Sequence, residues 1–341
     1  MGNDPNFNIE KRSINLSGRE VEIEKSDSKV VVPDFSELNN QISPLHVYKG
    51  YVEDDFHLIK SFIQQHAEVH DDFIVDGFSQ KTLKNSIPFC NSFNIEKLTF
   101  PVPDDGFHAE TLEYFALCDS INRTKHNFCI CELGAGWGPW ISLGEVLARS
   151  KKINKINLVG VEASPERFAL MKKQLSANGL RPNVESIITE YESVSCHLIQ
   201  GAISPLHTTL WFPKTEVTDM GAAVSSTDSD HDYLGRQVEN FPVNGYALKD
   251  LIGELTVDFL HIDIQGTEFD IIESEIEIIN SQVRAMLIGT HSRVIEGKLI
   301  YFLYKHGWHL LREKPCRINL VENPISIEAM TLVDGIQYWR R

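Results

Sequence analysis

The chain has 341 residues and a formal net charge of −16, with 42% hydrophobic and 23% charged residues. This length and composition are typical of a globular chain with about two domains, or one large domain with an extension. The acidic balance disfavours a general nucleic-acid partner, because such binding depends on basic surface. No apolar run approaches the roughly 18 residues of a membrane-spanning helix, and residues 1–10 contain no signal-peptide core. We therefore expect a cytoplasmic protein that does not insert into a membrane.

Residues 1–106 show no regular alternation of strands and helices. The stretch 1–34 is polar, which indicates a mobile arm or a peripheral hairpin. Apolar residues recur at helical spacing over 54–66 and predict a helix there. We interpret 1–106 as an N-terminal extension with a role in substrate binding or oligomerisation, and a homodimer is one expectation.

A strand, helix and strand then follow in close succession. An apolar run at 128–131 predicts a strand, and the helical pattern at 137–148 predicts a helix. A second apolar run at 156–161 predicts another strand, which ends at an acid, Glu162. An acid at the tip of the second strand can accept hydrogen bonds from a ribose diol. This layout predicts a nucleotide-type cofactor site.

The turn between the first strand and its helix contains Gly134, Gly136 and Gly138. Glycine supplies positive φ angles or close packing at little steric cost, which a direct strand-to-helix turn requires. We expect the free N–H groups of the first helical turn to face the ligand and to attract an anionic group. The strand context and the acid in register favour a cofactor site over an ordinary βαβ turn.

The spacing of the glycines discriminates between cofactors. The nicotinamide or flavin fingerprint is G-x-G-x-x-G, but Pro139 occupies its sixth position. The observed pattern is E-x-G-x-G-x-G, which begins at Glu132 and resembles that of class I S-adenosylmethionine-dependent methyltransferases. The resemblance implies that the turn packs against the methionine moiety and that the acid holds the ribose hydroxyls. The cofactor-binding residues implied are Glu132, Gly134, Ala135, Gly136, Gly138, Glu162, Ala163, Ser164 and Ala202.

The rest of the chain continues the alternation of strands and helices. Ser164 is a natural N-cap for a helix that stops at Asn178. The polar stretch 215–245 is long for a loop in a compact domain, which indicates a lid. The pattern as a whole predicts an α/β fold with a doubly wound, mostly parallel, seven-stranded sheet. The remaining predicted elements are a helix at 184–193, strands at 197–203, 208–212, 257–262 and 285–288, and a helix after a capping box of Thr267 and Asp270.

Polar side chains follow the predicted strands at their carboxyl ends. Glu132, Glu162, Asp263 and His291 all occupy such positions. In an open α/β sheet, ligands bind outside the carboxyl ends of the strands. We therefore expect these four side chains to surround one site.

Three further strings resemble the FkbM family of methyltransferases. They are HIDIQGTEFDII from His261, IGTHS around His291 and VDGIQYW from Val333. The resemblance covers 107–341, which we interpret as the methyltransferase domain. Members commonly have lysine where this chain has His261. The family resemblance implies O-methylation of a hydroxyl on a sugar, glycan or polyketide-type small molecule.

Methyl transfer to a hydroxyl is an in-line displacement in which the alcohol must lose its proton. Asp263 is the first candidate beside the transferred methyl, although it could instead cap a helix or contact the cofactor. His291 has the pKa range of a base, but it could be structural. Glu268 could orient the substrate or only favour a helix N-terminus. A divalent metal at Asp263 and His291, as in catechol-type enzymes, is not favoured, because the oxygen ligands are incomplete.

Two other functions stay open. One is a nicotinamide-dependent oxidoreductase, against which Pro139 argues. The other is a non-catalytic cofactor-binding protein whose acceptor site has decayed.

Overall fold

The computed structural model forms two compact units, residues 1–43 and 44–341. In the first unit, β1 (Lys11–Leu16) pairs antiparallel with β2 (Arg19–Glu24). None of the helices in the described residues is long and apolar enough to cross a bilayer. The described residues are 11–16, 19–24, 49–86, 101–104, 109–180, 187–188, 193–217, 219–232, 235–324 and 326–341.

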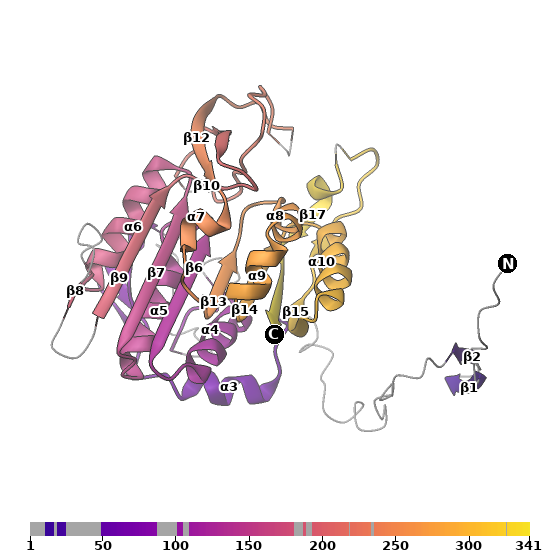
Figure 1. The fold of residues 1–341 in the computed structure, drawn as a ribbon, viewed down its shortest axis with the longest axis horizontal. Helices are drawn as coiled ribbons and strands as arrows, with labels where there is room; N and C mark the ends of the chain where they lie inside the picture. Colours follow the sequence, from indigo (N-terminus) through magenta and orange to yellow (C-terminus); the bar gives the residue numbers. More distant parts are fainter. Residues whose placement is uncertain are drawn as a thin grey trace. The chain divides into compact units, whose positions relative to one another are not determined.

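The second unit is built on a sheet with the strand order β15-β18-β14-β13-β6-β7-β9-β8 (Figure 1). Only β18 and β8 run antiparallel to the other strands. Apart from the two-residue edge strand β8, the sheet has seven strands, the number that the sequence predicts. Two of them, β15 and β18, have no counterpart among the strands predicted one by one, and the strand predicted at 208–212 lies in another sheet. The strands are β6 (Asn127–Leu133), β7 (Lys155–Glu162), β8 (Ile187–Ile188), β9 (Ser193–Gln200), β13 (Phe259–Ile262), β14 (Ala285–Thr290), β15 (His309–Lys314) and β18 (Gly335–Arg340).

Helices cover both faces of this sheet (Figure 1). Side chains alternate along each strand, so Phe259 of β13 packs with the first helix layer, and Leu260 and Ile262 pack with the second. His261 and Asp263 therefore face the side of α4 and α5. The first layer is α4 (Thr111–Arg123), α5 (Pro139–Ser150) and α6 (Pro165–Ala177), and the second is α7 (Leu248–Ile252), α8 (Glu268–Ser274), α9 (Ile276–Gln282) and α10 (Arg293–Lys305).

The described residues between residue 49 and α4 belong to the same compact unit as the eight-stranded sheet. Ile59 and Phe62, at the end of the helix α3 (Glu53–Lys60), share a hydrophobic cluster with Leu112 of α4. Asp55 accepts two hydrogen bonds from Arg312 of β15, each 2.8 Å long. The assignment of 1–106 to substrate binding or oligomerisation stays a prediction.

Three predicted elements differ from the observed ones. The helix predicted at 184–193 is wrong where the chain is described, because Ile187–Ile188 is β8 and β9 begins at Ser193; the other residues lie outside the described part. The strand predicted at 197–203 is divided at Gly201 into β9 and β10 (Ala202–Ile203). A Cβ at Gly201 would lie 2.6 Å from the Asn244 carbonyl oxygen, so the close approach of another strand causes this break.

The predicted loop 215–245 is shorter than expected, because it ends in β12 (Asn240–Tyr246). This strand lies between β10 and β11 (Thr208–Pro213) in a second, three-stranded sheet. The capping box of Thr267 and Asp270 is also wrong. Thr267 has ψ 11°, not the extended backbone of an N-cap, and its side chain makes no capping hydrogen bond.

A small sheet lies between α3 and α4 in the sequence, and a buried acid, Asp76, directly follows its second strand. The sheet consists of β3 (Glu68–Val69), β4 (Phe73–Val75) and β5 (Lys81–Leu83). The Asp76 Oδ1 atom accepts hydrogen bonds from two backbone N–H groups, but Oδ2 has no partner among the described residues. Burial raises the pKa of Asp76 from 3.8 to about 7, against the effect of the two N–H donors.

The folded protein therefore binds this proton more tightly than the unfolded chain does. We expect the contribution of Asp76 to stability to be lost as the pH rises from about 4 to about 7, on the order of 1–4 kcal/mol. Asp76→Asn should remove this part of the pH dependence, whereas Asp71→Asn, at an exposed position, should retain it. Urea unfolding at pH 5 and pH 8 measures the difference. The same pH dependence in all three proteins would contradict the assignment.

Candidate active site

The main cavity has a volume of about 440 Å³ and lies at the carboxyl ends of β6, β7, β13 and β14. Its size is in the range of sites for small molecules and cofactors. Its walls come from the glycine turn after β6, from parts of 201–224, from the N-terminal end of α4 and from 332–336.

The glycine turn is held against the two strands beside it. Gly134, Gly136 and Gly138 have φ angles of 75°, 54° and 75°, as the sequence predicts. The N–H groups of Gly134 and Ala135 donate to the Val161 carbonyl over 3.0 and 2.8 Å. A Cβ at Gly134 would lie only 1.8 Å from a backbone atom of β13's end, so no other residue fits there without a shift of the backbone.

The side chain of Glu132, near the end of β6, caps the start of helix α5. Its carboxyl group accepts the N–H of Ile141 at 2.9 Å and that of Trp140 at 3.4 Å. The expectation that these first-turn N–H groups face a ligand is therefore wrong, because an acid of the protein already takes them. Burial raises the pKa of Glu132 from 4.5 to about 8, against the effect of these donors.

Glu162 ties the end of β7 to the glycine turn. Its Oε2 accepts the N–H of Gly136 and its Oε1 that of Ser164, both at 2.7 Å. A carboxylate has about four acceptor positions, and these two hydrogen bonds do not fill them, so Glu162 can still accept from a hydroxyl group in the cavity. Burial raises the pKa of Glu162, while Ser164 and the Arg167 charge oppose the shift.

The expected cofactor residues divide into two groups. Gly138 and Ser164 do not line the cavity. Gly138 packs against Met171, where a Cβ would lie 2.7 Å from Cγ, and Ser164 caps α6 by accepting the N–H of Arg167 at 3.3 Å. The other expected residues, Glu132, Gly134, Ala135, Gly136, Glu162, Ala163 and Ala202, all line it.

An apolar wall lies beyond Glu162. Ala163, Ala202 and Phe212 belong to a small hydrophobic cluster that the second sheet helps to form. The segment 220–224 of the predicted lid completes this wall, through Met220 and Ala222 among others. An apolar slot beside an acid matches an aromatic base attached to a ribose.

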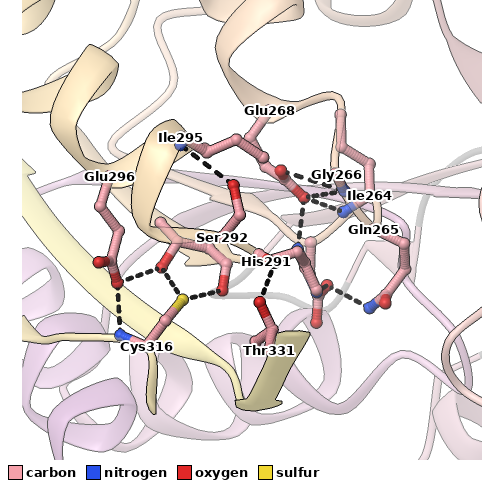
Figure 2. A network of polar contacts seen from close by, with 12 residues as sticks. Ile264, Gln265, Gly266, Glu268, His291, Ser292, Ile295, Glu296, Cys316 and Thr331 are labelled. Atoms are coloured by element: carbon pink, nitrogen blue, oxygen red, sulfur yellow. Dashed lines mark hydrogen bonds and ion pairs between the residues drawn. The ribbon is translucent and has the colours of Figure 1, made fainter. Parts of the chain in front are cut away.

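At the other end of the cavity, Asp263, His291 and Glu268 form a chain of contacts. The His291 imidazole lies between the two carboxyl groups, with Nε2 3.3 Å from Asp263 Oδ1 and Nδ1 2.8 Å from Glu268 Oε1. Figure 2 shows Glu268 held in turn by the backbone N–H groups of Ile264 and Gly266. Glu268 is fully buried and does not line the cavity, so the geometry favours a role in orienting His291 over the expected contact with substrate.

The charge state of this chain of contacts follows from its geometry. Burial by itself would lower the pKa of His291, but Glu268 and Asp263 raise it well above 6.5. For Asp263, burial opposes ionisation, but the hydrogen bond and charge of His291 bring its pKa below 3.8. At neutral pH His291 is therefore an imidazolium, which cannot accept a proton. This favours Asp263 over His291 as the proton acceptor.

The same three residues are close enough together to be considered as ligands of one metal ion. One ligand atom from each of Asp263, Glu268 and His291 lies within 4.8 Å of the others. However, Glu268 Oε1 already accepts hydrogen bonds from Ile264, Gly266 and His291. Only Asp263 and His291 then remain as protein ligands, whereas Mg²⁺ is bound by six ligand atoms, most of them oxygen. A resident metal stays unfavoured.

A second network of hydrogen bonds lies beside residues 332–336, which form the cavity wall at this end (Figure 2). The Glu296 Oε1 atom accepts the hydroxyl of Thr290 at 3.0 Å and the N–H of Cys316 at 2.6 Å. The Cys316 thiol donates to the Thr290 carbonyl at 3.1 Å. Gly335 packs so tightly here that a Cβ would lie 2.2 Å from Glu296 Oε1. The network thus positions the neighbouring Asp334 at the cavity wall.

Five ionisable residues that line the cavity were not assigned to the site from the sequence: Glu110, Glu113, Arg167, His261 and Asp334. Burial raises the pKa of Glu113 well above 4.5 and, for Asp334, raises it above 3.8. Asp334 stands in the closing string VDGIQYW, and His261 begins the string HIDIQGTEFDII. Those strings were a signal for two of the five, whereas nothing in the sequence pattern at α4 or α6 distinguishes Glu110, Glu113 or Arg167.

Comparison with known proteins identifies the family of this chain. Residues 142–309 match the methyltransferase FkbM domain. A relative from Jannaschia sp. (strain CCS1), named "Putative methyltransferase", is 31% identical over 255 residues, which cover 72% of this chain and 83% of the relative. The chain belongs to the FkbM methyltransferase family.

Two solved structures are also similar to this FkbM protein. A precorrin-6Y C5,15-methyltransferase from Geobacter metallireducens GS-15 is 12% identical, with a TM-score of 0.37, and covers 68% of this chain and 90% of its own. A methyltransferase FkbM from Methylobacillus flagellatus KT is 9% identical, with a TM-score of 0.35, and covers 70% of this chain and 56% of its own.

Methyltransferases of this type use S-adenosylmethionine, which is a cation. A cation bound beside Glu132 lowers the pKa of this acid from about 8, because it stabilises the charged form. Binding of S-adenosylhomocysteine, which retains the ammonium group, is therefore expected to release up to about one proton at pH 7 and almost none at pH 9. Calorimetry in buffers of different ionisation enthalpy counts the protons. Glu132→Gln should reduce the release, and an unchanged release in this variant would refute the assignment to Glu132.

Proposed function

We propose that this FkbM-family protein transfers a methyl group from S-adenosylmethionine to a hydroxyl of a sugar, a glycan or a related small molecule. The observation that carries the proposal is the position of Asp263. Its side chain is 42% exposed and opens onto the cavity, while His291 and Glu268 behind it are buried. An ionised carboxylate at this place can accept the proton of an alcohol.

The cavity residues fit S-adenosylmethionine. The apolar wall with Phe212 suits the adenine ring, and the remaining acceptor positions of Glu162 suit the ribose hydroxyls. The glycine turn leaves room for the chain that joins ribose to sulfur, because Gly134 and Gly136 have no side chains. When bound, the cofactor supplies an electrophilic methyl group on a sulfonium.

In the proposed reaction, Asp263 holds the acceptor hydroxyl in line with that methyl group. The hydroxyl oxygen forms a bond to the methyl carbon as the carbon–sulfur bond breaks, and the electron pair of that bond stays on sulfur. The hydroxyl proton passes to Asp263 and then to solvent. His291 keeps Asp263 ionised and oriented, and Glu268 keeps His291 protonated. Positioning of this kind supplies much of the rate of such a displacement.

The alternative of a nicotinamide-dependent oxidoreductase has less support. A dinucleotide needs the N-terminus of the helix after the glycine turn for its pyrophosphate. Here Glu132 takes the N–H groups of Trp140 and Ile141, so these donors are not free to bind a phosphate. The cytoplasmic location, the small-molecule or glycan partner and the homodimer also remain proposals.

Incubation with S-adenosylmethionine and a panel of sugars, glycan fragments and polyketide-type alcohols tests the function. The proposal predicts that S-adenosylhomocysteine forms only when a suitable alcohol is present. Formation should be insensitive to chelators, since no resident metal is proposed. Binding of NAD in place of S-adenosylhomocysteine would overturn the proposal in favour of the oxidoreductase. Tight S-adenosylhomocysteine binding without turnover on any acceptor would favour the non-catalytic binding protein.

A further inference from the structure

His261 is a buried titratable residue to which the proposed mechanism assigns no role. It lies in β13, two residues before Asp263, on the face of the sheet that α4 and α5 cover. Its side chain is 4% exposed and lines the main cavity. The Trp140 ring packs against its imidazole, with ring centroids 5.8 Å apart.

The Nδ1 atom of His261 has no hydrogen-bond partner within the described residues. Buried polar side-chain atoms are nearly always paired, because an unpaired one loses its hydration without compensation. Two other described residues contain such an atom, Asp76 and Ser86, and neither lines the cavity. A 180° rotation of the imidazole about its χ2 bond exchanges the positions of Nδ1 and Cδ2 without changing the space that the ring fills. Either orientation of the ring is therefore possible, and a ring nitrogen can face a ligand.

The surroundings of His261 define the chemistry of such a ligand. Burial lowers the pKa of His261 to about 4, so at neutral pH the imidazole is uncharged and has one N–H donor. Glu113 of α4 and Glu132, which is opposite His261 in the register of β6 and β13, line the same cavity. Two acids can hold an ammonium group, and the imidazole N–H can hold a carboxylate. This combination suits an α-amino-carboxylate.

The distance along the sheet is also suitable. Glu162 ends β7, Gly134 follows β6 and His261 lies in β13, and these three strands are neighbours. Adjacent strands are about 4.8 Å apart, so about 10 Å separates the first and third strands. With the ribose at Glu162, the amino-acid end of an extended cofactor lies over Gly134 and reaches His261. The acceptor then enters from the other side, at His291 and Asp334.

We propose that His261 donates a hydrogen bond to the α-carboxylate of S-adenosylmethionine. Together with Glu113 and Glu132, it forms a subsite for the amino-acid end of the cofactor. His261 is thus a cofactor-positioning residue, distinct from Asp263, which serves the acceptor. The inference rests on the proposed use of this cavity for the cofactor.

Calorimetry with two ligands tests the subsite. S-adenosylhomocysteine contains the amino-acid end, and 5′-methylthioadenosine lacks it. In His261→Leu, the Kd for S-adenosylhomocysteine should rise about 10-fold or more, as for the loss of a hydrogen bond to a charged group. The Kd for 5′-methylthioadenosine should stay within about two-fold of the wild-type value, which also shows that the variant is folded. His261→Asn places an amide N–H near the position of Nδ1 and should recover most of the affinity.

Two results would overturn the subsite. If the Kd values of both ligands rise equally in His261→Leu, the residue supports the shape of the cavity without contacting the carboxylate. If neither weakens, and the KM of the acceptor rises instead, His261 belongs to the acceptor site. Failure of the wild-type protein to bind S-adenosylhomocysteine would refute the cofactor assignment itself, so the two failures are distinguishable.

Discussion

Asp263→Asn is expected to lower kcat for methyl transfer by about 10²–10⁴-fold, the usual contribution of a positioned proton acceptor. The amide has the shape of the carboxylate but cannot take the hydroxyl proton. The Kd for S-adenosylhomocysteine should change by less than about three-fold, because Asp263 is proposed to contact the acceptor. Steady-state kinetics and calorimetry on the same preparation measure the two effects.

Asp270→Asn is the matched control, because Asp270 is exposed on α8 and outside the cavity. It should keep the wild-type kcat. A kcat for Asp263→Asn within about five-fold of wild type would be incompatible with proton acceptance by Asp263. A large rise in the S-adenosylhomocysteine Kd would instead place Asp263 at the cofactor.

Gly134→Ala is expected to raise the Kd for S-adenosylhomocysteine by about 100-fold or more, or to prevent folding. Its φ is 75°, and the new Cβ would lie 1.8 Å from the Asp263 carbonyl oxygen. The left-handed backbone by itself costs an L-residue about 1–2 kcal/mol. Relief of the clash requires β13 and the turn to separate, which moves Asp263 as well as the cofactor site.

Gly179→Ala is the control for Gly134→Ala, because it introduces backbone strain at a positive φ without a steric clash. Gly179 has φ 88° after α6, and a Cβ there would meet nothing within 4 Å. This variant should lose stability but retain the wild-type Kd. Gly136→Ala is a milder change at the site, because its Cβ would approach only the flexible end of Met220, at 3.0 Å. Wild-type affinity in both the Gly134 and Gly136 variants would show that the turn does not hold the cofactor.

Local signals in the sequence predicted much of the central fold. The apolar runs of β6 and β7, and the caps of α6 at Ser164 and Asn178, depend on neighbouring residues and appear as expected. The predictions from sequence are wrong at positions where contacts with residues far away in the chain determine the local structure. The strand break at Gly201 depends on the approach of β12. Glu132 of β6 accepts the first-turn N–H groups of α5, which the sequence predicts to face a ligand.

The site could be predicted in part for the same reason. Carboxyl ends of neighbouring parallel strands converge, so Asp263 and His291 could be expected to meet. Their charge state could not, because it depends on Glu268 reaching His291 from another element. The orphaned nitrogen of His261 depends on packing against Trp140 and has no counterpart in a sequence pattern.

The most direct test of the account follows the methyl group itself. The protein is supplied with S-adenosylmethionine labelled with ¹³C at the methyl group and with an alcohol from the panel that supports turnover. We expect a labelled methoxy carbon in the NMR spectrum of the product, formed at similar rates by wild type and Asp270→Asn and at least about 100-fold more slowly by Asp263→Asn. A label attached to nitrogen or carbon, or a methoxy product formed equally by Asp263→Asn, would contradict this expectation.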